Sequence, residues 1–146
     1  MKLIQDYIFS SDKNIMDIDA IHAYLSRSYW AKNVPHEIVR KAVENSLCFG
    51  VFYNKSQIGF ARLITDSATF AYLADVYILE EHRGKGLSQK LMQTILAHPQ
   101  LQGLRRMVLA TYDAHTLYEK FGFKQLSKPD TFMELWNPNV YKTLKK

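Results

Sequence analysis

The sequence has one cysteine, Cys48, which excludes a disulfide within the chain and fits a reducing compartment. No apolar run is long enough to cross a bilayer, and Asp6 interrupts the apolar N-terminal stretch, so we expect neither a membrane span nor a secretory signal. These absences predict a cytoplasmic protein. Because Cys48 lies in an alternating apolar stretch, we interpret it as a packed thiol rather than a nucleophile.

Clusters of metal-ligating residues and long basic runs are also missing. The histidines lack metal-ligand spacing with one another, and no Cys/His or carboxylate cluster appears, so we predict no metal cofactor. The 19 Lys and Arg exceed the 14 Asp and Glu, but the basic residues are scattered and show no RNA-binding signature. We therefore expect no nucleic-acid partner, although the net charge of +5 favours small anionic ligands.

The element pattern predicts one α+β domain over residues 1–146, with 137–146 as a short basic tail. Hydrophobic periodicity and turn signals predict strands at 3–9, 47–53, 57–65, 69–78, 104–111, 123–126 and 132–136, and helices at 17–29, 35–45, 87–97 and 114–121. The three strands between residues 47 and 78 follow one another through short turns, and this order of elements favours a mostly antiparallel sheet with helices on both faces.

The most informative segment is 72–92, which reads as a strand, a basic glycine loop and an amphipathic helix. Gly84 and Gly86 remove side chains where the chain turns, and the helix that follows begins with unpaired N–H groups and a positive dipole end. Such an arrangement binds phosphate. A dinucleotide fingerprint would need a third glycine where Gln89 stands, and a P-loop would need a different spacing. We expect the strand to end near Ile78 and the helix to begin near Gly86 or Leu87.

This loop resembles the acetyl-CoA loop of the GCN5-related N-acetyltransferase (GNAT) family, whose pattern is Arg/Gln-x-x-Gly-x-Gly/Ala. Arg83, Gly86 and Ser88 occupy the patterned positions, and Ser88 departs from the pattern while remaining small. A second family motif, Ala-x-x-Leu-Tyr-x-x-x-Gly-Phe, matches residues 114–123. Where the family often has Asn, this chain has Thr111.

The resemblance implies the GNAT fold and an acetyl-CoA-dependent N-acetyltransferase that moves an acetyl group directly to a primary amine. It implies acetyl-CoA or CoA as co-substrate and Tyr118 as the catalytic residue that protonates or positions the departing thiolate. The cofactor-binding residues that it implies are Val76, Tyr77, Ile78, Arg83, Gly84, Lys85, Gly86, Leu87 and Ser88. The Ile78 N–H would face the thioester carbonyl. Homodimers are common in the family, and nothing in the sequence fixes a dimer surface.

Four questions stay open at the level of sequence. The general base is not readable, although Asp75 is the most suggestive carboxylate, and a water chain to a distant carboxylate serves equally well. Tyr29 and Trp30 either wall an acceptor pocket or cap the core. The chain is either a catalyst or a binding module that keeps the acyl-CoA site without turnover. The identity of the acceptor is not encoded in any motif that we recognise.

Overall fold

The computed structural model describes residues 2–142 of the 146-residue chain. Its helices and strands in chain order are β1 (Tyr7–Ser10), α1 (Ile18–Leu25), α2 (His36–Glu44), β2 (Leu47–Tyr53), β3 (Ser56–Thr65), β4 (Phe70–Ile78), α3 (Leu87–Leu96), β5 (Arg106–Leu109) and α4 (His115–Glu119). The last four residues of the expected C-terminal tail lie outside the described range.

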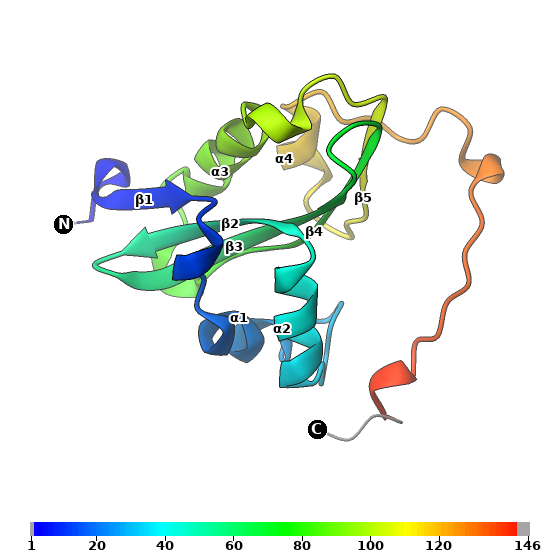
Figure 1. Cartoon of the computed structure of the whole chain (residues 1–146). Coiled ribbons are helices and arrows are strands. Elements are labelled where there is room, and N and C mark those ends of the chain that lie inside the picture. The colour runs from blue at the N-terminus through cyan, green and yellow to red at the C-terminus, as the bar shows by residue number, and fades with distance from the viewer. Residues whose placement is uncertain (1, 143–146) are drawn as a thin grey trace.

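The five strands form one sheet in the order β1-β2-β3-β4-β5. Neighbours from β1 to β4 are antiparallel, whereas β5 runs parallel to β4. Helices α1 and α2 cover one face, and α3 and α4 cover the other (Figure 1). This is the expected mixed, mostly antiparallel sheet with helices on both faces.

Each face of the sheet has its own hydrophobic cluster. Leu91, Met92 and Ile95 of α3 are fully buried against the sheet on one face, and Ile21 of α1 lies in the cluster on the other. Strand β2 is buried on both faces, so its apolar residues run continuously rather than alternating with exposed ones. Cys48 is buried there, and burial raises the pKa of its thiol to about 11, which confirms a packed rather than a reactive cysteine.

The two N-terminal elements are shorter than expected. Residues Ile4–Asp6 form a 3-10 turn rather than strand, because the Asp6 carboxylate accepts the Leu3 N–H at 2.9 Å. Helix α1 ends at Leu25 instead of continuing to residue 29. The Ser28 hydroxyl donates to the Leu25 carbonyl at 2.7 Å and accepts the Ala31 N–H, which closes a turn in place of the next helical turn.

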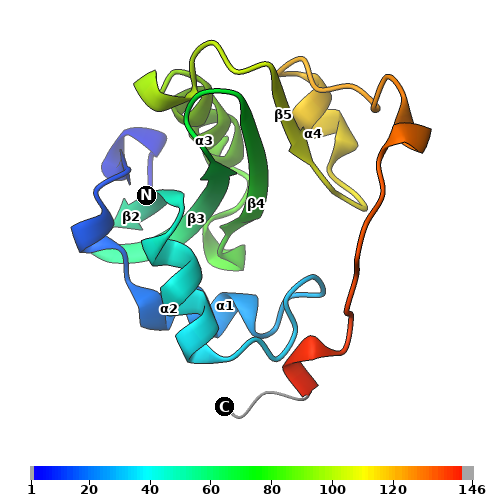
Figure 2. The ribbon, with the colours of Figure 1, turned by 45° about the vertical axis from the view of Figure 1, so that its right-hand side comes forward.

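The largest departure from expectation lies after α4. The expected strands at 123–126 and 132–136 are absent from the described residues, because neither segment pairs with a strand of this chain. Residues 124–139 instead form an extended segment, here called the C-terminal arm. The arm leaves the end of α4, passes outside β5 and reaches the face covered by α1 and α2 (Figures 1 and 2).

Candidate active site

Strands β4 and β5 separate halfway along their length. They pair from Phe70–Arg106 to Leu73–Leu109, but β4 continues to Ile78 without further pairing to β5. Figure 2 shows the two strands diverging toward their C-terminal ends. The β5-facing edge of β4 is therefore left with backbone groups that the sheet does not use between residues 74 and 78.

A β-bulge at Asp75 bends β4 where this separation begins. The register with β3 skips from Phe60–Tyr77 to Arg62–Ala74, and Asp75 has φ of 58°, a left-handed value that Asp tolerates better than most residues. The extra residue puts the neighbouring Ala74 and Asp75 side chains on the same face, where both line one pocket. Beyond the bulge, Val76 and Ile78 face the α3 side.

Hydrogen bonding to β3 fixes the direction of the Ile78 N–H. The Leu79 N–H donates to the Ile58 carbonyl at 2.8 Å, and antiparallel strands alternate in the side to which successive residues direct their N–H and C=O groups. The Ile78 N–H therefore points away from β3, toward the open side of β4. The Tyr77 N–H takes the opposite direction, toward β3. The Tyr77 ring is buried and stacks on the Tyr24 ring, with 4.0 Å between the ring centroids.

The glycine loop connects the end of β4 to the start of α3 as expected. Gly84 and Gly86 have φ of 80° and 79°, a backbone conformation that residues other than glycine rarely adopt. Gly86 is the N-cap of α3, and no side chain caps the first turn. Backbone N–H groups of Leu87 and Ser88 thus begin the helix without an intrahelical acceptor, at the positive end of its dipole.

The two basic side chains of the loop differ in their surroundings. Arg83 folds back on the strand, where its Nε donates to the Ile78 carbonyl at 2.8 Å and its Nη2 donates to the Tyr24 hydroxyl at 3.0 Å. Lys85 takes part in no ion pair among the described residues. The backbone and Lys85, rather than the Arg83 guanidinium, are the groups that this conformation offers to an anion.

Tyr118 lies on α4 with 8% of its surface exposed, and its ring meets Phe123 edge-on. Burial raises the pKa of its phenol, and Tyr29 and Asp113 raise it further. The phenol therefore stays protonated through neutral pH. The helix that holds it starts after Thr111, whose hydroxyl accepts the Ala114 N–H at 3.0 Å.

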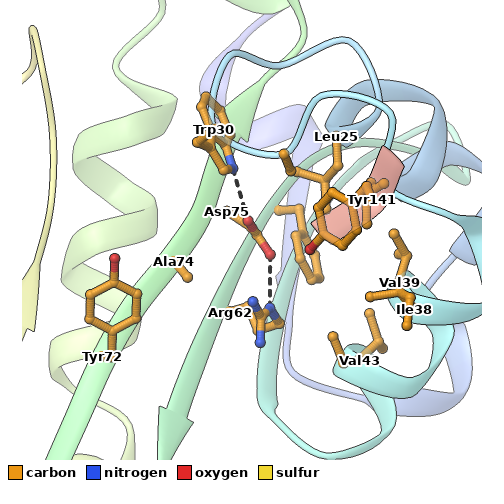
Figure 3. A pocket seen from close by; sticks show the side chains of 14 residues that line it. Leu25, Trp30, Ile38, Val39, Val43, Arg62, Tyr72, Ala74, Asp75 and Tyr141 are labelled. Carbon is orange, nitrogen blue, oxygen red and sulfur yellow. Dashed lines mark hydrogen bonds and ion pairs between the residues drawn. The ribbon is translucent and has the colours of Figure 1, made fainter. Parts of the chain in front are cut away.

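A pocket of about 230 Å³ opens beside the bulge, on the α1 and α2 face of the sheet. Asp75 lies in it and accepts hydrogen bonds from Arg62 Nε and Trp30 Nε1, both at 2.8 Å (Figure 3). Ile38 and Val39 of α2 form an apolar wall, and Tyr141 from beyond the arm also lines the pocket.

Tyr29 and Trp30, 58% and 40% exposed, lie at the surface, so they do not cap the core. Their rings contact each other, and Tyr29 also contacts Tyr112, 5.3 Å away between centroids. Tyr112 lies in the segment between β5 and α4, whereas Trp30 lines the pocket beside β4. The aromatic row therefore bridges the separated ends of the two parallel strands.

Glu80 and His82, between β4 and the loop, have structural partners. Glu80 accepts two hydrogen bonds from Arg27, and this ion pair lowers the Glu80 pKa to about 2. His82 is buried and hydrogen-bonded to the Tyr7 hydroxyl at 2.7 Å, and burial lowers its pKa. Both residues belong to the 3-10 turn that leads into the loop. No group of three or more metal-ligating residues occurs within residues 2–142, and no helix described there is long and apolar enough to span a membrane.

The fold, with its mixed sheet and its glycine loop before α3, matches solved structures of acetyltransferases. Comparison with known proteins gives the family: the model of the Acetyltransferase (GNAT) family matches residues 16–123. The chain belongs to the GNAT acetyltransferase family.

Individual relatives agree with this assignment. A Gibberella zeae protein named as a putative acetyltransferase is 36% identical over 138 residues, covering 79% of this chain and 77% of that protein. A Xanthomonas campestris pv. campestris crystal structure, described as a putative GNAT acetyltransferase, is 49% identical with a TM-score of 0.91, covering 94% of this chain and 97% of that one. An Elizabethkingia anophelis GNAT acetyltransferase with acetyl-CoA bound shares the fold, with a TM-score of 0.64, 16% identity and coverage of 90% and 89%.

Sequence reasoning missed the Arg62–Asp75–Trp30 network. Arg62 stands within the apolar strand β3, and both it and Asp75 have side chains that are mostly buried, at 16% and 10% exposure. A charged side chain in a buried strand requires a partner, so the sequence alone could have predicted that Arg62 is paired. It could not have predicted that the partner is Asp75, because this pairing depends on the bulge.

Proposed function

We propose that the protein transfers an acetyl group directly from acetyl-CoA to a primary amine. One observation carries the proposal: the unpaired edge of β4 leads directly into a glycine loop at an uncapped helix start. The first feature suits an extended pantetheine arm, and the second suits a pyrophosphate. The bound acetyl-CoA of a relative with the same fold supports this choice of co-substrate.

In this proposal the acetyl-pantetheine arm lies along Val76, Tyr77 and Ile78, held by backbone hydrogen bonds. The Ile78 N–H, directed toward the open side of β4, donates to the thioester oxygen as negative charge develops on it. Tyr77 makes no hydrogen bond to the arm in this proposal, because its N–H faces β3 and its side chain lies on the other face of the sheet. The N–H groups of Gly84 to Ser88 and the Lys85 ammonium receive the phosphates, while Arg83 holds the loop against Ile78.

The amine enters from the pocket beside Asp75 and attacks the thioester carbon across the bulge. Tyr29 and Trp30 form the aromatic wall of this entrance. Asp75, which already accepts two hydrogen bonds, attracts the cationic amine. The ammonium proton passes through a water to the Asp75 carboxylate, and the neutral amine then attacks. Tyr118 gives its proton to the departing CoA thiolate; burial raises the pKa of its phenol, so the proton is present when the thiolate leaves.

The test of function is a thiol-release assay with acetyl-CoA and a panel of amines, amino acids and lysine peptides. Acceptor-dependent release of free CoA, with the acetylated amine identified by mass spectrometry, is the expected result. CoA binding without turnover on any acceptor would favour the alternative function, a non-catalytic acyl-CoA-binding module on the same fold.

Replacing Gly86 with valine tests the cofactor site. We expect CoA affinity to fall at least tenfold in calorimetry, because a β-branched side chain disfavours φ of 79° and lies where phosphates would approach the backbone. Gly103→Val is the matched control, since Gly103 has a similar φ of 73° outside the loop. If folded Gly86→Val binds CoA as tightly as Gly103→Val does, the proposed phosphate site is wrong.

A further inference from the structure

We infer that the pocket beside Asp75 binds an apolar α-amino acid as a zwitterion, and that this amino acid is the acetyl acceptor. Its ammonium lies at Asp75, its carboxylate at Arg62 and its side chain against the apolar wall of the pocket. The inference rests on the proposed acetyl transfer for its chemistry. Binding of the amino acid can be measured without turnover, so the two proposals fail separately.

The charges inside the pocket cancel. Asp75 and Arg62 are the only charged side chains among the described residues that line it. They pair at 2.8 Å, and both side chains are mostly buried (Figure 3). A ligand with a net charge would therefore leave that charge uncompensated in a place with little access to water, which costs free energy. The pocket favours a ligand whose own charges also cancel, which disfavours a polyamine or a simple amine cation.

The Arg62 guanidinium has N–H donors that this chain does not use. Its Nε donates to Asp75 at 2.8 Å, and its Nη1 donates to the Ser46 hydroxyl at 3.1 Å. The remaining donors, those of Nη2 and one of Nη1, have no hydrogen-bond partner among residues 2–142. A guanidinium binds a carboxylate through two parallel N–H···O bonds, and these donors suffice for that. The side chain therefore calls for a carboxylate on the ligand.

The contact between Asp75 and Arg62 sets the spacing of the charges on the ligand. Each Asp75 carboxylate oxygen accepts one hydrogen bond, from Trp30 or from Arg62, and has a second acceptor site left for an ammonium. Because the two protein groups touch, the ammonium and the carboxylate of the ligand must also be adjacent. In an α-amino acid both groups are attached to the same carbon, so the zwitterion matches the ion pair.

The rest of the pocket determines the kind of side chain. Aliphatic and aromatic groups of α1, α2 and β3 form its wall, namely Leu25, Ile38, Val39, Val43 and Phe60. At about 30 Å³ for each water molecule, the pocket of about 230 Å³ has room for about eight. Free leucine or methionine has this size. A lysine or glutamate side chain would instead place a second charge against the apolar wall.

Acetyl transfer to this ligand balances as follows. One ammonium proton passes through a water to Asp75, the N–C bond forms, and the C–S bond of the thioester breaks. Tyr118 protonates the departing thiolate and regains a proton from the nitrogen that becomes the amide. The products are an N-acetyl amino acid, CoA as the free thiol and one proton.

Calorimetry on the CoA-bound protein tests the site. The two probes are L-leucine and 3-methylbutylamine, which is leucine without its carboxylate. We expect leucine to bind at least tenfold more tightly. Equal or tighter binding of the amine, or no binding of leucine, would overturn the inference.

Two variants locate the ligand. Arg62→Lys keeps a cation beside Asp75 and loses the planar fork, so the affinity for leucine should fall to about that of the amine, whereas general damage would weaken both ligands alike. Ala42→Leu adds bulk on the pocket side of α2, so the affinity for leucine should fall at least tenfold. Ala23→Leu is the matched control, because Ala23 is exposed on α1 and does not line the pocket. Unchanged leucine affinity in both Arg62→Lys and Ala42→Leu would place the ligand elsewhere and overturn the inference.

The thiol-release assay then separates this inference from the proposed function. Acetylation of leucine at a kcat/KM at least tenfold above that of 3-methylbutylamine supports both. Acetylation of the amine or of a lysine peptide in preference to leucine would keep acetyl transfer and overturn the inference. Tight binding of leucine without release of CoA would support the zwitterion site and overturn acetyl transfer.

Discussion

At the scale of single residues, Tyr118 makes the clearest distinction between catalysis and binding. Tyr118→Phe removes the proton that we assign to the departing thiolate and keeps the ring that packs against Phe123. We expect kcat to fall about a hundredfold or more, the usual worth of general acid catalysis, with CoA affinity nearly unchanged. Steady-state kinetics with a true acceptor and calorimetry with CoA measure the two effects separately.

Tyr112→Phe is the control for this substitution. Tyr112 lies near the same end of the molecule but is 83% exposed, so loss of its hydroxyl should leave kcat unchanged. Equal kcat for the two variants, under conditions where chemistry limits the rate, would remove Tyr118 from the mechanism. The loop assignment would stand, because it rests on different residues.

The residues of the candidate site differ in how far the sequence reveals them. Gly84 and Gly86 were predictable, because a left-handed backbone at a helix start restricts the residue type, and the structure confirms that conformation. The role of Tyr118 stays a prediction. The Arg62–Asp75 pair could not be located, since a bulge shifts the register between β3 and β4 and brings together side chains that strict alternation would separate.

At the scale of elements, local turn chemistry determined which boundaries were predictable. The turn at Asn54 and Lys55 has positive φ at both residues, as two-residue hairpins require, and strand β2 has the expected bounds. Helix α1 stops early because serine side chains compete for its last carbonyls. The strands expected at 123–126 and 132–136 did not form, because a strand needs a partner edge and neither segment pairs with a strand among the described residues.

The turn between β3 and β4 gives an element-scale prediction. Asp66 accepts hydrogen bonds from the Thr69 hydroxyl and from the N–H groups of Thr69, Ala68 and Phe70, and these bonds hold its pKa well below the ordinary 3.8. Because the folded-state pKa is depressed, this contribution to stability is present above pH 3.8 and is lost as pH falls below it.

Asp66→Ala should therefore unfold at a lower temperature than wild type at pH 7, and the gap should narrow in acid. Thermal melts at both pH values measure it. Asp12→Ala is a useful comparison, since the Asp12 carboxylate caps a 3-10 turn by accepting one N–H, from Asn14. Asp12→Ala should therefore lower the unfolding temperature by less than Asp66→Ala does. A gap that is constant across the acidic range would mean that the Asp66 charge contributes nothing to the turn.

At the scale of the whole molecule, the fold was predictable because its two motifs are far apart and lie in the order that one architecture requires. The C-terminal arm was not predictable, since its apolar residues look the same in sequence whether or not a strand of the sheet pairs with them. Overall charge adds a property that neither residue nor element supplies. The chain as a whole carries a net charge of +5, which attracts a phosphate-rich ligand.

This field should speed the arrival of CoA. The Debye length shrinks from about 30 Å at 0.01 M salt to about 3 Å at 1 M, so the association rate measured by stopped flow should fall steeply over that range. Lys85→Gln and Lys55→Gln each remove one positive charge, but Lys85 lies in the glycine loop and Lys55 in the β2–β3 turn. If the field at the loop guides the ligand, Lys85→Gln should slow association severalfold at low salt and Lys55→Gln only slightly. Equal rates for the two variants would assign the effect to net charge alone, and a rate independent of salt would exclude steering.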